Sequence, residues 1–262
     1  MANPFAADTM AAGYATARPP VHPRILERVF DHLERRRPFD RAVDLGCGAG
    51  ISTRALLPFA NRCVGVEPAE SMLKWVADIA PTADFVVGRA EAIPVRDRSV
   101  DLITAAGSLN YSDVGLALRE AARVLVDGGV LLVYDFSPGR HFTDNNRLDE
   151  WFTKFAVRYP PPAEEGRELS PEILAQFDSG LRMQSHEDVE IGIELTPGFY
   201  LDYILTETNV AAAMREGIPA EEIRSWCAET LDPVWQGQNH EVVFRGYFAC
   251  LRTEPRPSGS GG

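Results

Sequence analysis

The residues best able to do chemistry in this 262-residue chain gather around one glycine-rich segment, Val43-Asp44-Leu45-Gly46-Cys47-Gly48-Ala49-Gly50. Glycines at alternating positions leave backbone N–H groups bare, so a ligand can approach the main chain closely. Glu67 follows 21 residues after Gly46, at the end of the next apolar run. A carboxylate there can accept two hydrogen bonds from a ribose diol. The spacing therefore predicts a nucleoside-bearing cofactor that lies across two neighbouring strands.

The spacing of the glycines also bears on which cofactor this is. A dinucleotide fingerprint reads G-x-G-x-x-G, whereas this chain has G-x-G-x-G preceded by Asp44. An acid beside the turn is a poor neighbour for a pyrophosphate and a good one for an ammonium group or its bound water. The pattern favours a cationic amino-acid nucleoside over NAD.

The elements that must position these residues alternate between strand and helix. Short apolar runs predict strands at 42–45, 62–67, 84–87, 100–105 and 129–136, with helices near 51–60, 70–80 and 113–125. This order is typical of βαβ units in a doubly wound, mostly parallel sheet with helices on both faces.

The flanking segments predict helices around this core. An amphipathic helix is expected over 23–37, with the run Arg35–Arg37 at its C-terminal end. After Phe136 we expect four helices: one within 141–162, one that begins at Ser170, and two near 197–206 and 219–231. We also expect strands at 188–195 and 241–251. The tail 253–262 is rich in Pro, Gly and Ser and is expected to be flexible.

Four segments in order resemble the class I S-adenosylmethionine-dependent methyltransferases of the type 11 group: VDLGCGAG, VGVEPAESML, GRAEAIPVRDRSVDLI and REAARVLVDGGVLLVYDF. More weakly, Tyr14–Pro19 is similar to the Y-x-x-x-R-P segment of trans-aconitate-methyltransferase-like members. The resemblance implies a seven-stranded sheet whose last strand is antiparallel. It also implies one methyltransferase domain over 1–252, with a helical cap from about 1–37, 140–185 and 197–235.

The resemblance also implies roles for individual residues in holding S-adenosylmethionine. Asp44 would orient the methionine end, Gly46 and Gly48 would let the backbone pack against it, and Glu67 would hold the ribose hydroxyls. The remaining cofactor-binding expectations are Cys47 in the turn, Ala90 at the adenine edge, Ala106 and Gly107 at the methionine part, and Tyr14 as a cover. Arg89 stands where the family has an adenine-binding Asp, so Glu91 or a backbone carbonyl is expected to take that contact.

The expected reaction is displacement of the sulfonium methyl by a nucleophile on a small molecule. O-methylation of a carboxylate or hydroxyl is favoured, and C-methylation of a quinone or another carbon nucleophile is the alternative. A carboxylate needs no general base, whereas a hydroxyl or carbon acid does, and His141, Tyr111 and Asp135 are the candidates. Asn110 and Tyr111 are also candidate substrate contacts. An NAD-type oxidoreductase and a non-catalytic nucleotide-binding module stay open as other classes.

Composition excludes several further classes. The 26 basic against 38 acidic residues give a net charge of −12, which disfavours nucleic-acid substrates. No apolar stretch approaches the roughly 18–20 residues that span a bilayer, and the first residues lack the pattern of a secretory signal. The four cysteines and five histidines show no metal-ligand spacing. We therefore expect a cytoplasmic protein with reduced cysteines, a small-molecule substrate and no metal, and the sequence leaves the oligomeric state open.

Overall fold

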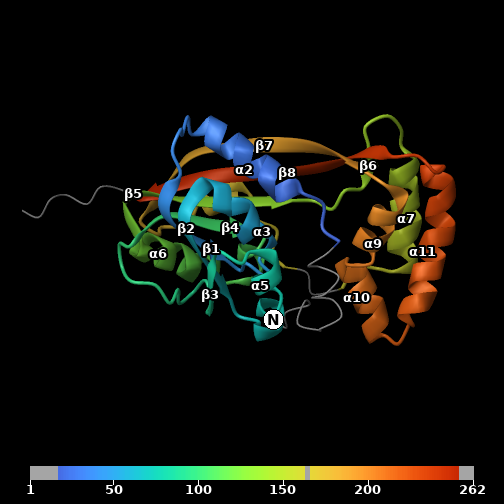
Figure 1. Cartoon of the computed structure of the whole chain (residues 1–262), viewed down its shortest axis with the longest axis horizontal. Coiled ribbons are helices and arrows are strands. Elements are labelled where there is room, and N and C mark those ends of the chain that lie inside the picture. Colours follow the sequence, from blue (N-terminus) through green and yellow to red (C-terminus); the bar gives the residue numbers. More distant parts are fainter. Residues whose placement is uncertain (1–16, 163–165, 254–262) are drawn as a thin grey trace, which may run out of the picture.

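A single mixed sheet organises the protein in the computed structural model, which describes residues 17–162 and 166–253 (Figure 1). Its order is β3-β2-β1-β4-β5-β8-β6, and β7 also pairs with β8. The strands are β1 (Phe39–Leu45), β2 (Ala60–Glu67), β3 (Asp84–Val87), β4 (Val100–Ala106), β5 (Leu125–Phe136), β6 (His141–Phe142), β7 (Leu181–Leu195) and β8 (His240–Thr253).

Strands β1 to β5 run parallel, as the alternation of strands and helices predicts, and β8 is antiparallel to β5, as the family resemblance implies. The sheet has eight strands in place of the expected seven, because the two-residue strand β6 adds to the edge of β8. The order reverses between β1 and β4, so the carboxyl ends of β1, β2 and β4 open on one crevice at the switch point.

Helices cover both faces of the sheet. One apolar core joins α2 (Val21–His32) and α3 (Ile51–Leu56) to the sheet and continues into the cap, and a second joins α6 (Val114–Val124) and α8 (Pro171–Leu174). The helix starts follow their sequences: Asp113 and Ser170 accept hydrogen bonds from the backbone N–H groups of Leu116 and Ile173. The remaining short elements are η1 (Leu57–Phe59), α4 (Glu70–Leu73), α5 (Val76–Ile79) and η2 (Leu109–Tyr111).

The cap is a cluster of helices at one end of the sheet, and it shares the first apolar core (Figure 1). It consists of α7 (Arg147–Arg158), α9 (Pro197–Ile204), α10 (Thr208–Arg215) and α11 (Ala220–Trp235). The indole N–H of Trp151 donates to the Thr230 hydroxyl at 2.8 Å and joins α7 to α11. Asn209 on α10 donates to the backbone oxygen of Tyr159 at 2.7 Å.

The structure corrects several expected boundaries. Helix α2 lies against α3, β7 and β8, and α8 lies against β7 and β8, so neither belongs to the cap. Helix α2 ends at His32, which leaves the run Arg35–Arg37 outside it, and the Arg35 guanidinium lies 3.7 Å from the centre of the Phe39 ring. The single helix expected at 70–80 is two short helices, α4 and α5. Helix α10 was not predicted, and Thr253 belongs to β8 and not to the tail.

Two findings concern the described residues only. None of their helices has the length and apolar character that crossing a membrane requires. All four cysteines are buried and unpaired.

Candidate functional site

The glycine-rich loop turns sharply between β1 and α3. The backbone N–H groups of Gly46 and Cys47 donate to the carbonyl oxygen of Val66 on β2, at 2.8 and 3.2 Å. Gly46 has a φ of +65°, and a Cβ built there would lie 2.3 Å from the Cβ of Ser108. Only glycine fits this position, because both the backbone conformation and the space exclude a side chain.

Asp44 is fully buried beneath the loop. Its Oδ2 accepts hydrogen bonds from the hydroxyls of Ser52 and Thr53, each at 2.7 Å, and its Oδ1 accepts one from Thr104 at 2.8 Å. Burial raises the pKa of this carboxyl, and the three hydroxyl donors oppose that rise. Asp44 therefore ties β1, the first turn of α3 and β4 together.

Glu67 ends β2 and is 4 % exposed. Its Oε1 accepts from the Ala69 N–H at 2.9 Å, and its Oε2 accepts from the Gly48 N–H at 3.1 Å. Burial raises its pKa, and these two N–H donors act in the opposite direction. The carboxylate is thus held by backbone on both sides, with acceptor capacity left over.

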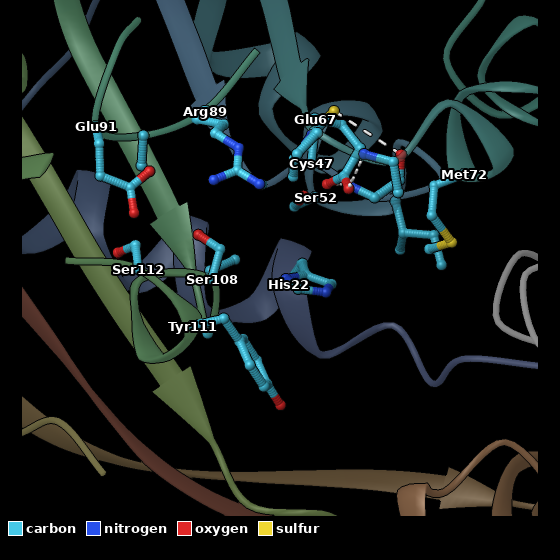
Figure 2. Close-up of a pocket in the computed structure, with 18 residues that line it drawn as sticks. His22, Cys47, Ser52, Glu67, Met72, Arg89, Glu91, Ser108, Tyr111 and Ser112 are labelled. Carbon is cyan, nitrogen blue, oxygen red and sulfur yellow. Dashed lines mark hydrogen bonds between the residues drawn. The ribbon is translucent and has the colours of Figure 1, made fainter. Parts of the chain in front are cut away.

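These elements enclose a cavity of about 380 Å³. It brings together nearly all the residues that the sequence assigns to a cofactor, and Figure 2 shows Glu67, Arg89, Glu91 and Tyr111 around one space. The predicted residues that line it are Gly46, Cys47, Gly48, Glu67, Ala90, Glu91, Ala106, Gly107 and Tyr111. Burial, with Asp44 and Glu67 nearby, raises the pKa of the Cys47 thiol far above its usual range, so Cys47 fills space and is not a nucleophile.

Other predicted residues lie outside this lining. Asp44 is behind the loop, as described above. Asn110 donates to Oδ2 of Asp135 at 2.8 Å. Asp135 lies behind Gly107, and burial raises the pKa of its carboxyl. Tyr14 lies outside the described residues.

The structure does not bring His141 to the cavity. The chain leaves β5 and pairs with β8 as β6, and His141 there contacts Asp149 of α7 in the cap. His141 is therefore left out of the proposed mechanism. Among the described residues, no cluster of three or more His, Cys, Asp or Glu side chains could hold a metal ion.

His22, at the start of α2, is a cavity residue that the sequence does not single out. Its side chain lines the cavity, and its Nδ1 lies 2.9 Å from the hydroxyl of Tyr134 on β5. The two residues are 112 positions apart. No local spacing signals such a pair, so only the folded chain reveals it.

The family comparison matches residues 43–133, which hold the glycine-rich loop and β1 to β5, to a model described as a methyltransferase domain. This chain carries a class I methyltransferase domain. The resemblance stated from the sequence is thereby confirmed, and so is S-adenosylmethionine as the cofactor of the domain.

Among curated proteins, an uncharacterized methyltransferase of Bacillus subtilis, YcgJ, is 37 % identical over 157 residues, which is 57 % of this chain and 59 % of YcgJ. The malonyl-[acyl-carrier protein] O-methyltransferase of Methylococcus capsulatus is 38 % identical over 106 residues, or 38 % of each chain. The chain thus spans about half the length of the curated relatives it matches.

Solved structures agree on the fold. A putative type II methyltransferase from Anaeromyxobacter dehalogenans has a TM-score of 0.64 at 21 % identity, covering 87 % of this chain and 97 % of that one. The crystal structure of YcgJ has a TM-score of 0.52 at 23 % identity, with the same coverage of each chain. The doubly wound, mostly parallel sheet with flanking helices is thereby confirmed.

Proposed function

We propose that the whole protein transfers the methyl group of S-adenosylmethionine to an oxygen atom of a small molecule. The observation that carries this proposal is the buried carboxylate of Glu67, which lines the cavity at the switch point beside Gly46 and Gly48, where no side chain blocks the backbone. That combination fits a ribose diol next to an amino-acid end.

The residues present fit each part of the cofactor. Glu67 would accept hydrogen bonds from the ribose hydroxyls, and the backbone of Gly46 and Gly107 would flank the methionine end. Ala90 and Glu91 follow β3, on the outer side of β2, and would meet the adenine. Asp44 acts through the loop that it anchors, because its carboxylate is buried away from the cavity.

When bound, S-adenosylmethionine supplies a methyl group on a positively charged sulfur that needs no further activation. The work left to the chain is alignment of the acceptor oxygen, which can lower a barrier by about 7–11 kcal/mol.

Of the three general-base candidates, His141 and Asp135 do not line the cavity and Tyr111 does. A carboxylate acceptor, which needs no base, is therefore favoured. The relative named an O-methyltransferase supports oxygen as the methylated atom. The net charge of −12 supports a small molecule over a nucleic acid, and the four reduced cysteines support a cytoplasmic site of action.

Calorimetric titration with S-adenosylhomocysteine and NAD, side by side, tests cofactor choice: the first should bind and the second should not. Incubation with methyl-labelled S-adenosylmethionine and a panel of aliphatic and aromatic carboxylates, phenols and quinols then tests the acceptor class. Base-labile label in a methyl ester is the expected product. Tight binding without transfer to any acceptor supports the binding-module alternative, and NAD binding supports the oxidoreductase alternative.

A further inference from the structure

His22 lines the cavity but is not among the residues proposed to hold the cofactor. His22 is the second residue of α2 and is 8 % exposed, although an imidazole is polar at both nitrogens. A buried polar ring of this kind is normally satisfied by partners on both sides. In His22, only one side is satisfied.

The ring is fixed in place by β5. Its Nδ1 is hydrogen-bonded to the Tyr134 hydroxyl at 2.9 Å, and its edges meet the rings of Tyr134 and Phe136 at centroid distances of 5.7 and 5.2 Å. Over residues 17–162 and 166–253, the Nε2 atom makes no hydrogen bond, and it is not among the fully enclosed polar atoms. Nε2 therefore opens on the cavity, and Figure 2 shows the His22 and Tyr111 side chains at the same space.

The position of the ring separates it from the ribose and the adenine. In the arrangement proposed above, the adenine and ribose lie over β3 and β2, and the methionine end lies over β1 and β4. His22 is hydrogen-bonded to β5, which follows β4 in the sheet, so in that arrangement it faces the cavity from beyond the methionine end. That is the side on which an acceptor would approach the methyl group.

The charge state of the ring suits this position. Burial, together with the nearby guanidinium groups of Arg18 and Arg54, lowers the pKa of His22 to about 4. The ring is therefore neutral near pH 7 and does not repel a sulfonium. Tyrosine hydroxyls donate well and imidazole nitrogens accept well, so Tyr134 donating to Nδ1 leaves the proton on Nε2, facing the cavity.

We propose that His22 is the positioning residue for the methyl acceptor, and that its Nε2–H donates a hydrogen bond to one oxygen of an acceptor carboxylate. The inference rests on the proposed function and adds the acceptor side to it. The free carboxylate oxygen forms the new O–C bond as the C–S bond breaks, and the electron pair of that bond goes to sulfur. No proton moves, and His22 ends the step unchanged.

Two amide variants separate the two nitrogens. His22→Gln places an amide N–H near the position of Nε2 and keeps the donor to the cavity. His22→Asn reaches only the position of Nδ1 and removes that donor while keeping a partner for Tyr134. His186→Gln, on the exposed outer part of β7, is the matched control.

The probes are S-adenosylhomocysteine for cofactor affinity and whichever of benzoate, cinnamate, malonate and octanoate gives most methyl ester with the wild type. His22→Asn should raise the acceptor KM at least tenfold and change the Kd of S-adenosylhomocysteine less than twofold. His22→Gln should recover most of the loss, and His186→Gln should match the wild type. The ¹⁵N spectrum of histidine-labelled protein should show a protonated Nε2 in His22, and Tyr134→Phe should shift that tautomer toward Nδ1–H.

Three outcomes overturn the inference. The first is an acceptor KM that is unchanged in His22→Asn. The second is a tenfold loss of S-adenosylhomocysteine binding in His22→Asn with an unchanged acceptor KM, because His22 would then hold the cofactor. The third is the absence of ester from all four carboxylates. Failure of the wild type to bind S-adenosylhomocysteine contradicts the proposed function itself and is read from the first titration.

Discussion

Removal of the Glu67 side chain should weaken cofactor binding. The carboxylate accepts from the Gly48 and Ala69 N–H groups at 3.1 and 2.9 Å, and its remaining lone pairs face the cavity. Two hydrogen bonds from ribose hydroxyls to a carboxylate are worth about 1.5–3 kcal/mol each. Glu67→Ala should therefore raise the Kd of S-adenosylhomocysteine by about 100-fold or more.

Glu67→Gln gives an intermediate case. The amide keeps one acceptor oxygen, loses the charge and turns a donor toward Gly48 or the ribose, so a weakening of about tenfold is expected. Glu70→Gln is the matched control, because Glu70 lies three residues further on, is exposed and does not line the cavity.

Isothermal titration at pH 7.5 measures all three variants, and thermal melts by circular dichroism verify that they fold. Because burial raises the pKa of Glu67, wild-type affinity should decline on acidification from a higher pH than an ordinary Glu would give. A change of less than threefold in Glu67→Ala would refute the ribose assignment.

Three further outcomes are expected. Gly46→Ala should abolish S-adenosylhomocysteine binding and lower the melting temperature, because its Cβ would lie 2.3 Å from the Ser108 Cβ at a φ of +65°. The control Gly198→Ala should do neither, because a Cβ at this exposed position meets nothing within 4 Å. Asp44→Asn should lower the free energy of unfolding by about 1–3 kcal/mol in urea titrations, since an amide cannot accept from all of Ser52, Thr53 and Thr104; an unchanged midpoint would contradict the network. Between pH 6.5 and about 4, the unfolded chain binds a proton at His22 that the native protein does not, so the free energy of unfolding should fall on acidification. That fall is about 3 kcal/mol at most, and pH-dependent melts of His22→Gln should lack it.

The core of the site follows from local sequence. Gly46, Gly48 and Glu67 each stand at the end of a strand that its own apolar run predicts, and parallel topology brings such ends together. The same reasoning does not hold for His141. This residue follows β5 closely in sequence, but it lies in β6, which pairs with β8, and it does not line the cavity. Proximity in sequence to a strand end indicates a site only when the next residues stay over the crevice.

Contacts over long sequence separations escaped prediction. Thr104 reaches Asp44 from 60 residues away, so the sequence cannot show that this acid is fully satisfied behind the loop. Tyr134 reaches His22 from 112 residues away. The cap boundaries also escaped, since the amphipathic pattern of α2 marks an apolar face without indicating whether sheet or cap covers it.

The cap stands at the end of the β7–β8 pair, which extends past β5, because β5 pairs with β8 only over Gly246–Arg252. Strands β7 and β8 pair from Leu181↔Thr253 to Leu195↔His240, and at about 3.3 Å per residue a 15-residue strand extends about 50 Å. Figure 1 shows this strand pair running from the region of β5 to the cap helices. Because α9 begins two residues after β7 ends, an approach of the cap toward the cavity must bend the part of this strand pair that lies beyond β5. The strand pair also sets the reach of the cap: two residues added to each strand would advance it by about 7 Å and leave every side chain on its present face.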